Sequence, residues 1–119
     1  MNTDTRPSWK LLELYQTEWC PASRRVRQRL TELDVTYVGR QVPVEREERL
    51  ALLRRTGTDS IPALVCEDGE VLVGEAEILA YLDERFPEPA GAEAHRLTAI
   101  KARRRELEEA ARCLESATY

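Results

Sequence analysis

The chain has 119 residues, of which 42% are hydrophobic and 34% charged, and its formal net charge is −4. This length suits one folded domain, and the composition is globular rather than disordered or collagenous. The acidic balance argues against a nucleic-acid binder, and no apolar run approaches the roughly 20 residues of a membrane span. The N-terminus lacks the apolar stretch of a secretory signal. We therefore expect a cytoplasmic protein without nucleic-acid or membrane partners.

Hydrophobic periodicity and turn residues divide the chain into alternating strands and helices. Helices are indicated where apolar residues recur every three or four positions, and strands by short apolar or β-branched runs. In chain order we predict a polar tail over 1–10, a strand over 11–16, a helix over 21–34, a strand over 35–42, a helix over 45–56, strands over 63–67 and 71–73, a helix over 75–86, a linker over 87–91 and a last helix over 92–116.

The order of these elements is β-α-β-α-β-β-α with one extra C-terminal helix. The first two strands are joined by a helix and should be parallel. The second pair flanks Asp68-Gly69, a dipeptide typical of a tight turn, and should form an antiparallel hairpin. These pairings predict an α/β domain with a four-stranded mixed sheet covered by helices on both faces.

The three cysteines are Cys20, Cys66 and Cys113. Their odd number and wide spacing fit neither a disulfide framework nor a zinc site built from Cys-x-x-Cys pairs. We therefore expect free thiols in a reducing compartment and no metal site. Cys66 lies among apolar residues of a predicted strand and is expected in the core.

Cys20 stands where the first predicted strand gives way to the first helix, directly before Pro21. A sulfur at this position faces the unpaired N–H groups and the positive end of the helix dipole, which favour the thiolate. Arg24 and Arg25 add positive charge, whereas Glu18 opposes it. Together these groups predict a thiol pKa below the ordinary value of about 8.5 and a reactive nucleophile. The alternative is a small buried cysteine with a packing role.

Four motifs in this order resemble those of glutaredoxins and of the thioredoxin-like N-terminal domain of glutathione transferases. They are Leu14-Tyr15, Cys20-Pro21-Ala22-Ser23, Gly57 with Ser60-Ile61-Pro62, and Gly74-Glu75-Ala76-Glu77-Ile78. The resemblance covers residues 11–86 and implies a thioredoxin-like fold. It implies that Cys20 is the nucleophile of the Cys-Pro-x-Ser motif and that Ser23 replaces the second cysteine of dithiol members. The expected activity is that of a monothiol glutaredoxin-like thiol-disulfide oxidoreductase.

The resemblance also implies a glutathione site, with glutathionylated molecules as substrates. Ile61-Pro62 matches the family's cis Val-Pro, whose first residue offers its backbone to the cysteinyl part of glutathione. Glu75, Ala76 and Glu77 open the next helix, where free N–H groups could hold the γ-glutamyl carboxylate, and Glu77 could hold its ammonium. An ordinary turn proline and acidic residues that suit the helix dipole are the alternatives. Of the 18 basic residues most are Arg, typical of GC-rich genomes, so an analogous low-molecular-weight thiol is an alternative to glutathione.

Two other functions stay open. Transferases usually have Glu or Gln followed by Ser where this chain has Gly74-Glu75, and a single helix follows the linker in place of an all-helical domain. The chain could therefore be a non-catalytic binding module related to a transferase N-terminal domain, with its last helix as the partner-binding element. An iron–sulfur carrier is a further alternative, although Pro21-Ala22 differs from the Cys-Gly-Phe-Ser typical of those carriers.

The last predicted helix carries a narrow apolar stripe. Its members are Leu97, Ile100, Leu107, Ala111 and Leu114, and Arg104 interrupts them. The stripe can pack on the chain's own domain or pair with a second copy. Because a long coiled coil would require an apolar residue in place of Arg104, we expect docking on the chain's own domain and a monomer, with a dimer through this helix as the alternative.

Overall fold

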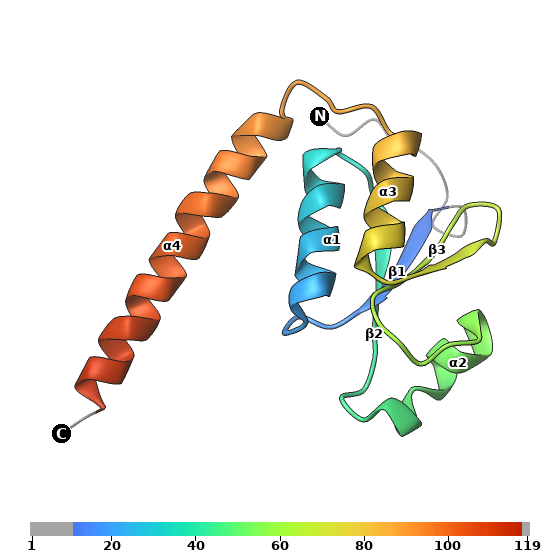
Figure 1. Ribbon diagram of the computed structural model, residues 1–119, viewed down its shortest axis with the longest axis horizontal. Coiled ribbons are helices and arrows are strands. Elements are labelled where there is room, and N and C mark those ends of the chain that lie inside the picture. Colours follow the sequence, from blue (N-terminus) through green and yellow to red (C-terminus); the bar gives the residue numbers. More distant parts are fainter. Residues whose placement is uncertain (1–10, 118–119) are drawn as a thin grey trace.

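A four-stranded mixed sheet organises the computed structural model, which describes residues 11–117 (Figure 1). The strands are β1 (Leu12–Gln16), β2 (Tyr37–Gln41), β3 (Ala63–Val65) and β4 (Val71–Val73), in the spatial order β2-β1-β3-β4. β1 and β2 are parallel, whereas β3 pairs antiparallel with both β1 and β4. The predicted α/β fold class and the predicted pairings are confirmed. The tail predicted over residues 1–10 lies outside the described residues.

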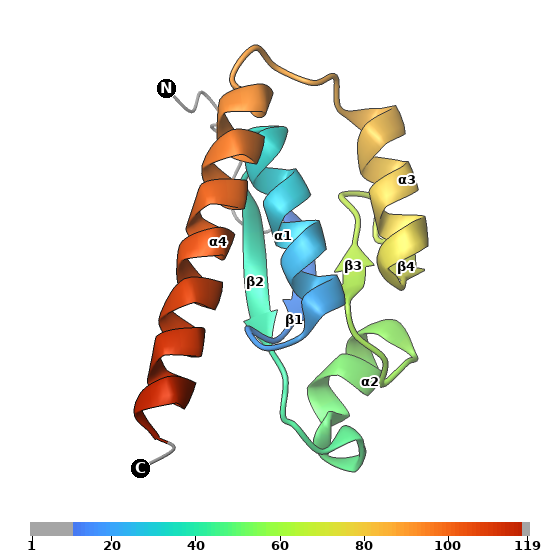
Figure 2. The same ribbon diagram turned by 60° about the vertical axis from the view of Figure 1, so that its left-hand side comes forward.

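Helices cover both faces of this sheet (Figure 2). α1 (Pro21–Glu32) and α3 (Glu75–Arg85) pack on one face, and α2 (Leu50–Thr56) lies against the other. Successive β1 side chains point to opposite faces, so Leu14 belongs to the core under α1 and α3, whereas Tyr15 packs with Leu52 of α2. Packing on both faces of the sheet therefore fixes the end of β1, from which the chain continues into α1.

The helix predicted over 45–56 is wrong in its first half. A 3-10 turn (Arg46–Glu48) precedes α2, and the two are separated at Arg49, whose φ of −82° and ψ of 53° are not helical. The Arg49 side chain is buried and donates hydrogen bonds to backbone carbonyls of the neighbouring loops. Tertiary hydrogen bonding of one arginine thus overrides the local helical pattern.

The last helix, α4 (Ala92–Ser116), does not dock along the domain as predicted. Only Ala92 is buried, while Leu97, Ile100 and Leu107 are 51%, 56% and 56% exposed. The facing surface of α1 presents polar side chains, among them Arg24, so the stripe finds no apolar partner there. α4 therefore diverges from α1 toward its C-terminal end (Figure 1).

Ion pairs hold the N-terminal end of α4. Arg96 pairs with Glu32 of α1 at 3.2 Å and with Glu88 of the preceding segment at 2.6 Å. Arg29 of α1 contacts the same two carboxylates, at 2.8 Å and 3.2 Å. None of the helices over residues 11–117 combines the length and the apolar character that a membrane span requires.

Candidate active site

Cys20 is the N-cap residue of α1, as the sequence predicts. Its backbone is extended, with φ −78° and ψ 117°, and Pro21 occupies the first turn, where a missing N–H costs no helical hydrogen bond. The Cys20 sulfur accepts a hydrogen bond from the backbone N–H of Ser23 at 3.4 Å. The thiol therefore takes the place of the hydroxyl or carboxylate that ordinarily caps a helix.

The surroundings of Cys20 favour its ionised form. Burial is the largest single influence and raises the pKa, but the Ser23 side chain, the backbone N–H groups of Ser23 and Ala22, and the charge of Arg25 together outweigh it. The net result is a pKa of the Cys20 thiol below its ordinary value, in the predicted direction. Glu18, the expected opposing charge, is paired with Arg27 at 3.1 Å.

Two buried hydroxyl groups lie in the turn that carries Cys20 and in the first turn of α1. Ser23 is fully buried and Thr17 is 4% exposed, and among the described residues neither hydroxyl oxygen has a hydrogen-bond partner of good geometry. Buried polar groups without partners are rare and call for an explanation. The Ser23 side chain lowers the pKa of the Cys20 thiol, so its hydroxyl is placed to donate a hydrogen bond once the sulfur is ionised.

Arg27 fixes the loop that precedes Cys20. Its guanidinium donates to the side chain of Gln16, to the Thr17 carbonyl oxygen at 3.0 Å and to the Glu18 carboxylate at 3.1 Å. These contacts hold the end of β1 against α1 and draw the Glu18 charge toward Arg27. The sequence analysis did not identify Arg27, because one arginine on the polar side of a helix has no distinctive spacing.

The Ile61-Pro62 peptide bond is cis, as predicted. The Pro62 carbonyl oxygen accepts a hydrogen bond from the Gly74 N–H at 2.9 Å, which joins this turn to the start of α3. Ile61 takes part in none of the turn, loop and cap hydrogen bonds between backbone groups of residues 11–117. Its backbone groups are thus available to an extended ligand.

Arg49 anchors the segment that leads into the cis bond, a second role that the sequence analysis did not identify. The side chain is 6% exposed and donates to the carbonyl oxygens of Pro43 at 2.8 Å, Val44 at 3.1 Å and Asp59 at 2.9 Å. Asp59 lies two residues before Ile61. Through its hydrogen bond to the Asp59 carbonyl, Arg49 therefore helps to fix the backbone that leads into Ile61.

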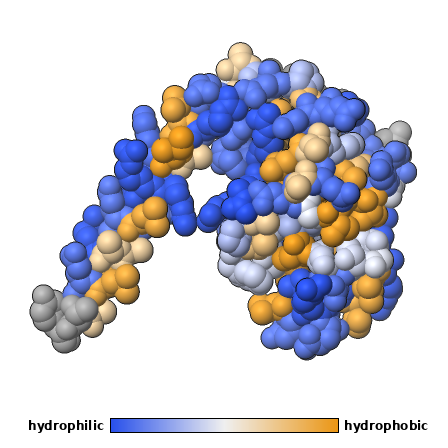
Figure 3. Space-filling model, in the orientation of Figure 1, coloured by the Kyte–Doolittle hydropathy of each residue, from blue (hydrophilic) through white to orange (hydrophobic). Residues whose placement is uncertain are grey.

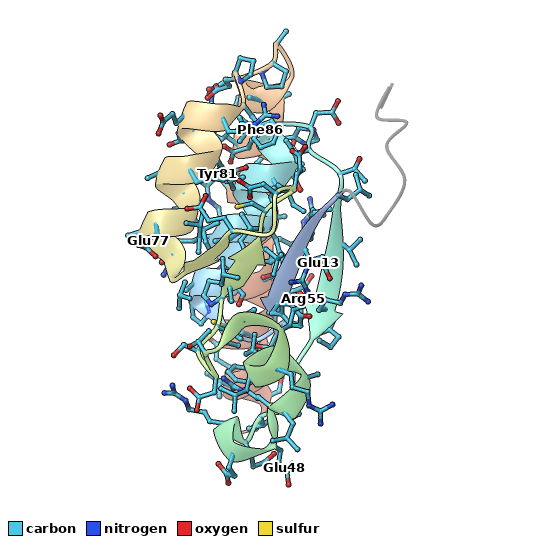
Figure 4. The ribbon with its side chains drawn as sticks, turned by 90° about the vertical axis from the view of Figure 1, so that its right-hand side faces the viewer. Glu13, Glu48, Arg55, Glu77, Tyr81 and Phe86 are labelled. Carbon is cyan, nitrogen blue, oxygen red and sulfur yellow. The ribbon has the colours of Figure 1, made fainter. Side chains whose placement is uncertain are left out.

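The start of α3 lies beside the start of α1. Gly74 caps α3 with φ 94°, a value that favours glycine, and no side chain caps the first N–H groups of the helix. Glu75 forms a bidentate ion pair with Arg25, whose Nη2 lies 2.8 Å from Oε1. The Glu77 carboxylate accepts from the Val73 N–H at 3.3 Å, and Glu77 lies on the outer side of α3 (Figure 4). Arg25 therefore pairs with Glu75 at the predicted glutathione-binding turn, and its charge also lowers the pKa of the Cys20 thiol.

The other two thiols differ from Cys20. Cys66 is 4% exposed in the core, as predicted, and burial raises the pKa of its thiol. Cys113 is exposed on α4. Among residues 11–117, no three His, Cys, Asp or Glu side chains cluster in a way that could hold a metal ion.

Comparisons with known proteins agree with this geometry. The family model described as the glutathione S-transferase N-terminal domain matches residues 14–90. No curated protein sequence matches the chain. A glutathione S-transferase from Rhodospirillum rubrum F11 is 31% identical, with 66% of this chain and 35% of that protein covered and a TM-score of 0.56. A diazinon-metabolizing glutathione S-transferase from the silkworm Bombyx mori is 27% identical, with coverages of 63% and 38% and a TM-score of 0.56.

A glutathione transferase homolog from Sulfitobacter, solved with bound glutathione, is 24% identical, with coverages of 71% and 44% and a TM-score of 0.58, and shows the fold alone. The chain spans little more than a third of the length of the Rhodospirillum protein.

Proposed function

The chain belongs to the glutathione S-transferase N-terminal domain family, and from that premise we propose a monothiol thiol-disulfide oxidoreductase of the glutaredoxin type. Its substrates are mixed disulfides of glutathione, or of a similar low-molecular-weight thiol, and its nucleophile is Cys20. The observation that carries the proposal is the Cys20 sulfur at the N-terminus of α1, with a lowered pKa. The proposal includes a cytoplasmic location and a division into a domain over 11–86, a linker over 87–91 and a C-terminal helix over 92–119, whose last two positions lie outside the described residues.

The reaction is a pair of thiol-disulfide exchanges. The Cys20 thiolate attacks the glutathionyl sulfur of the substrate, the substrate disulfide breaks, and the substrate leaves as a thiolate that takes a proton from water. Cys20 is then bonded to glutathione. A second glutathione thiolate attacks the glutathionyl sulfur of this bond, which releases the Cys20 thiolate and glutathione disulfide. In the net reaction the sulfur of one free glutathione is oxidised to the disulfide level and the sulfur of the substrate is reduced to a thiol, so no other reductant is required.

Each predicted site residue has a stated task in this scheme. Pro21 starts the helix that stabilises the thiolate, and the Ser23 hydroxyl donates to whichever sulfur carries the negative charge. Ile61, held by cis Pro62, offers its backbone to the cysteinyl unit of glutathione. The uncapped N–H groups of Glu75, Ala76 and Glu77 hold its γ-glutamyl carboxylate. The free Ile61 backbone groups and the absence of a side-chain cap on α3 within the described residues support these assignments.

The test is reduction of a glutathionylated peptide by glutathione, with glutathione disulfide measured as the product. Wild-type protein should turn over, and Cys20→Ser should lose all activity above the uncatalysed rate. The matched control replaces both Cys66 and Cys113 by Ser and should keep the activity of wild type. Activity in Cys20→Ser would contradict the proposal, and loss of turnover in the double variant would contradict a purely monothiol cycle.

The exposed stripe of α4 favours a second candidate, a binding module without catalysis. In that case α4 is the partner-binding element, and the function does not depend on ionisation of the Cys20 thiol. The rate of Cys20 alkylation against pH separates the two candidates. A midpoint near the ordinary thiol value of about 8.5 favours the binding module, and a clearly lower midpoint favours the oxidoreductase.

A further inference from the structure

A groove runs between α1 and α4, where the two helices diverge. Its volume is about 610 Å³, and α1 contributes Arg24 and Arg25 while α4 contributes Ile100, Arg103, Arg104 and Leu107. Figure 3 shows the opening between α4 and the rest of the molecule, with hydrophilic side chains on both of its borders. A volume of roughly 300–1,000 Å³ is typical of ligand sites. We call this site the arginine groove.

The charge of the arginine groove is opposite to that of the whole chain. Four of its lining residues are arginines and one, Glu106, is acidic, whereas the chain has a formal net charge of −4. Arg103 pairs with Glu106 at 3.2 Å, and Arg25 pairs with Glu75. Arg24 and Arg104 form no ion pair with a residue of the described part of the chain. A local excess of arginine on an acidic protein attracts anions and repels cations.

One wall of the groove lies close to the nucleophile in the first turn of α1. Arg24 and Arg25 lie one turn after Cys20, and the Arg24 backbone N–H donates to the Cys20 carbonyl oxygen at 3.0 Å. The positive charge of Arg25 lowers the pKa of the Cys20 thiol. Residues that flank the cysteine of a polypeptide bound at Cys20 are therefore within reach of Arg24 and Arg25.

Besides its positive charge, the arginine groove has apolar surface on the α4 side. Ile100 and Leu107 lie one above the other on α4 and remain more than half exposed. A ligand that fills the groove covers these side chains with its own aliphatic carbons while its carboxylates meet the arginines. Aspartate and glutamate side chains, mixed with a few apolar ones, have this chemistry.

We propose that the arginine groove binds the acidic flank of a glutathionylated polypeptide, so that the protein selects mixed disulfides on acidic segments. The inference rests on the proposed function and names the substrate class of the same site. The chemistry is the first exchange described above: the bond between Cys20 and the glutathionyl sulfur forms, and the acidic polypeptide leaves as a thiolate. The carboxylates of the polypeptide stay paired with arginines during the attack. This pairing keeps the leaving sulfur in line with the glutathionyl sulfur and the attacking Cys20 sulfur.

The first test compares matched peptides in which a glutathionylated cysteine is flanked by Asp and Glu, by Ser and Asn, or by Lys. At low ionic strength we expect kcat/KM to be roughly tenfold higher for the acidic than for the neutral peptide, because two or three exposed pairs each contribute a few-fold. The preference should shrink as salt is added. Equal rates for the three peptides, or a preference for Lys, would overturn the inference.

The second test reverses charges in the groove. The double variant Arg103→Glu and Arg104→Glu should lose the preference for the acidic peptide and gain activity toward the Lys peptide. Arg112→Glu makes the same kind of change on the same helix outside the groove and should behave as wild type. Thermal unfolding followed by circular dichroism checks that each variant is folded.

Binding separates failure of the inference from failure of the proposed function. Fluorescence anisotropy of the labelled, unglutathionylated acidic peptide is measured with Cys20→Ser protein, in which no exchange occurs. Tighter binding of the acidic than of the Lys peptide, lost when Arg103 and Arg104 are replaced by Glu, supports the groove even if no mixed disulfide is reduced. Reduction of all peptides at one rate, with no difference in binding, contradicts the groove and leaves the oxidoreductase intact.

Discussion

Replacement of Arg49 by Ala should lower the free energy of unfolding more than replacement of the neighbouring Arg46. Arg49 is 6% exposed and donates to three backbone carbonyl oxygens. A hydrogen bond to a charged group contributes about 1.5–3 kcal/mol when its partner stays buried. Pro43 and Val44 are exposed and their carbonyls can be hydrated after the change, so we take about 1 kcal/mol for each bond. The expected loss is about 3 kcal/mol.

The assay is chemical and thermal unfolding followed by circular dichroism. For a chain of this size, about 3 kcal/mol corresponds to a fall in Tm of roughly 12 °C. Arg46→Ala is the matched control, because Arg46 contacts the same segment through the Asp59 carboxylate at 2.6 Å but is 60% exposed. Exposed ion pairs contribute little, so Tm should barely change in the control. A loss below about 1 kcal/mol for Arg49→Ala, or equal losses in both variants, would refute the reasoning.

Three further predictions concern reactivity, pH and α4. Iodoacetamide should label Cys20 before Cys113 and Cys66 at neutral pH, and Arg25→Gln should raise the pKa of Cys20, because the lost charge favours the thiolate; faster labelling of Cys66 would contradict this order. Burial raises the pKa of Glu32, but hydrogen bonds from Gln28, Arg29 and Arg96 outweigh it and the pKa is lowered. The stability that Glu32 contributes is thus present above the unfolded value of about 4.3 and is lost as pH falls through the lower folded pKa. Denaturant titrations of wild type and Glu32→Gln should differ at neutral pH and converge in acid; a constant difference would contradict the assignment. Deletion of residues 98–119 should lower Tm by only a few degrees in a melting experiment, because buried Ala92 and the ion pairs of Arg96 remain; a large loss would show that α4 packs more closely.

Patterns local in sequence predicted most of the fold. The structure confirms three features that depend on residues close in sequence. They are the Asp68-Gly69 turn, the start of α1 at Pro21 and the parallel β1-α1-β2 connection. The cis Ile61-Pro62 bond and the position of Cys20 followed from the family resemblance, which rested on motifs of several residues.

The errors share a cause, which is side chains that act across the fold. Arg49 breaks the expected helix because its partners, Pro43 and Asp59, are brought to it by tertiary structure. Arg27 was missed because it pairs with Glu18 across the β1-α1 turn, a contact that sequence spacing does not show. The predicted docking of the α4 stripe on the chain's own domain is wrong because the facing side of α1 presents arginines.

The central claim is that Cys20 accepts glutathione from a mixed disulfide, and one measurement tests it directly. Wild-type protein is mixed with an excess of a glutathionylated peptide without reduced glutathione, the reaction is quenched with acid, and the intact protein and its peptides are analysed by mass spectrometry. The account predicts one glutathione per chain, located on Cys20, with one equivalent of peptide thiol released. An unmodified Cys20, or a glutathione carried on Cys113 instead, would contradict it.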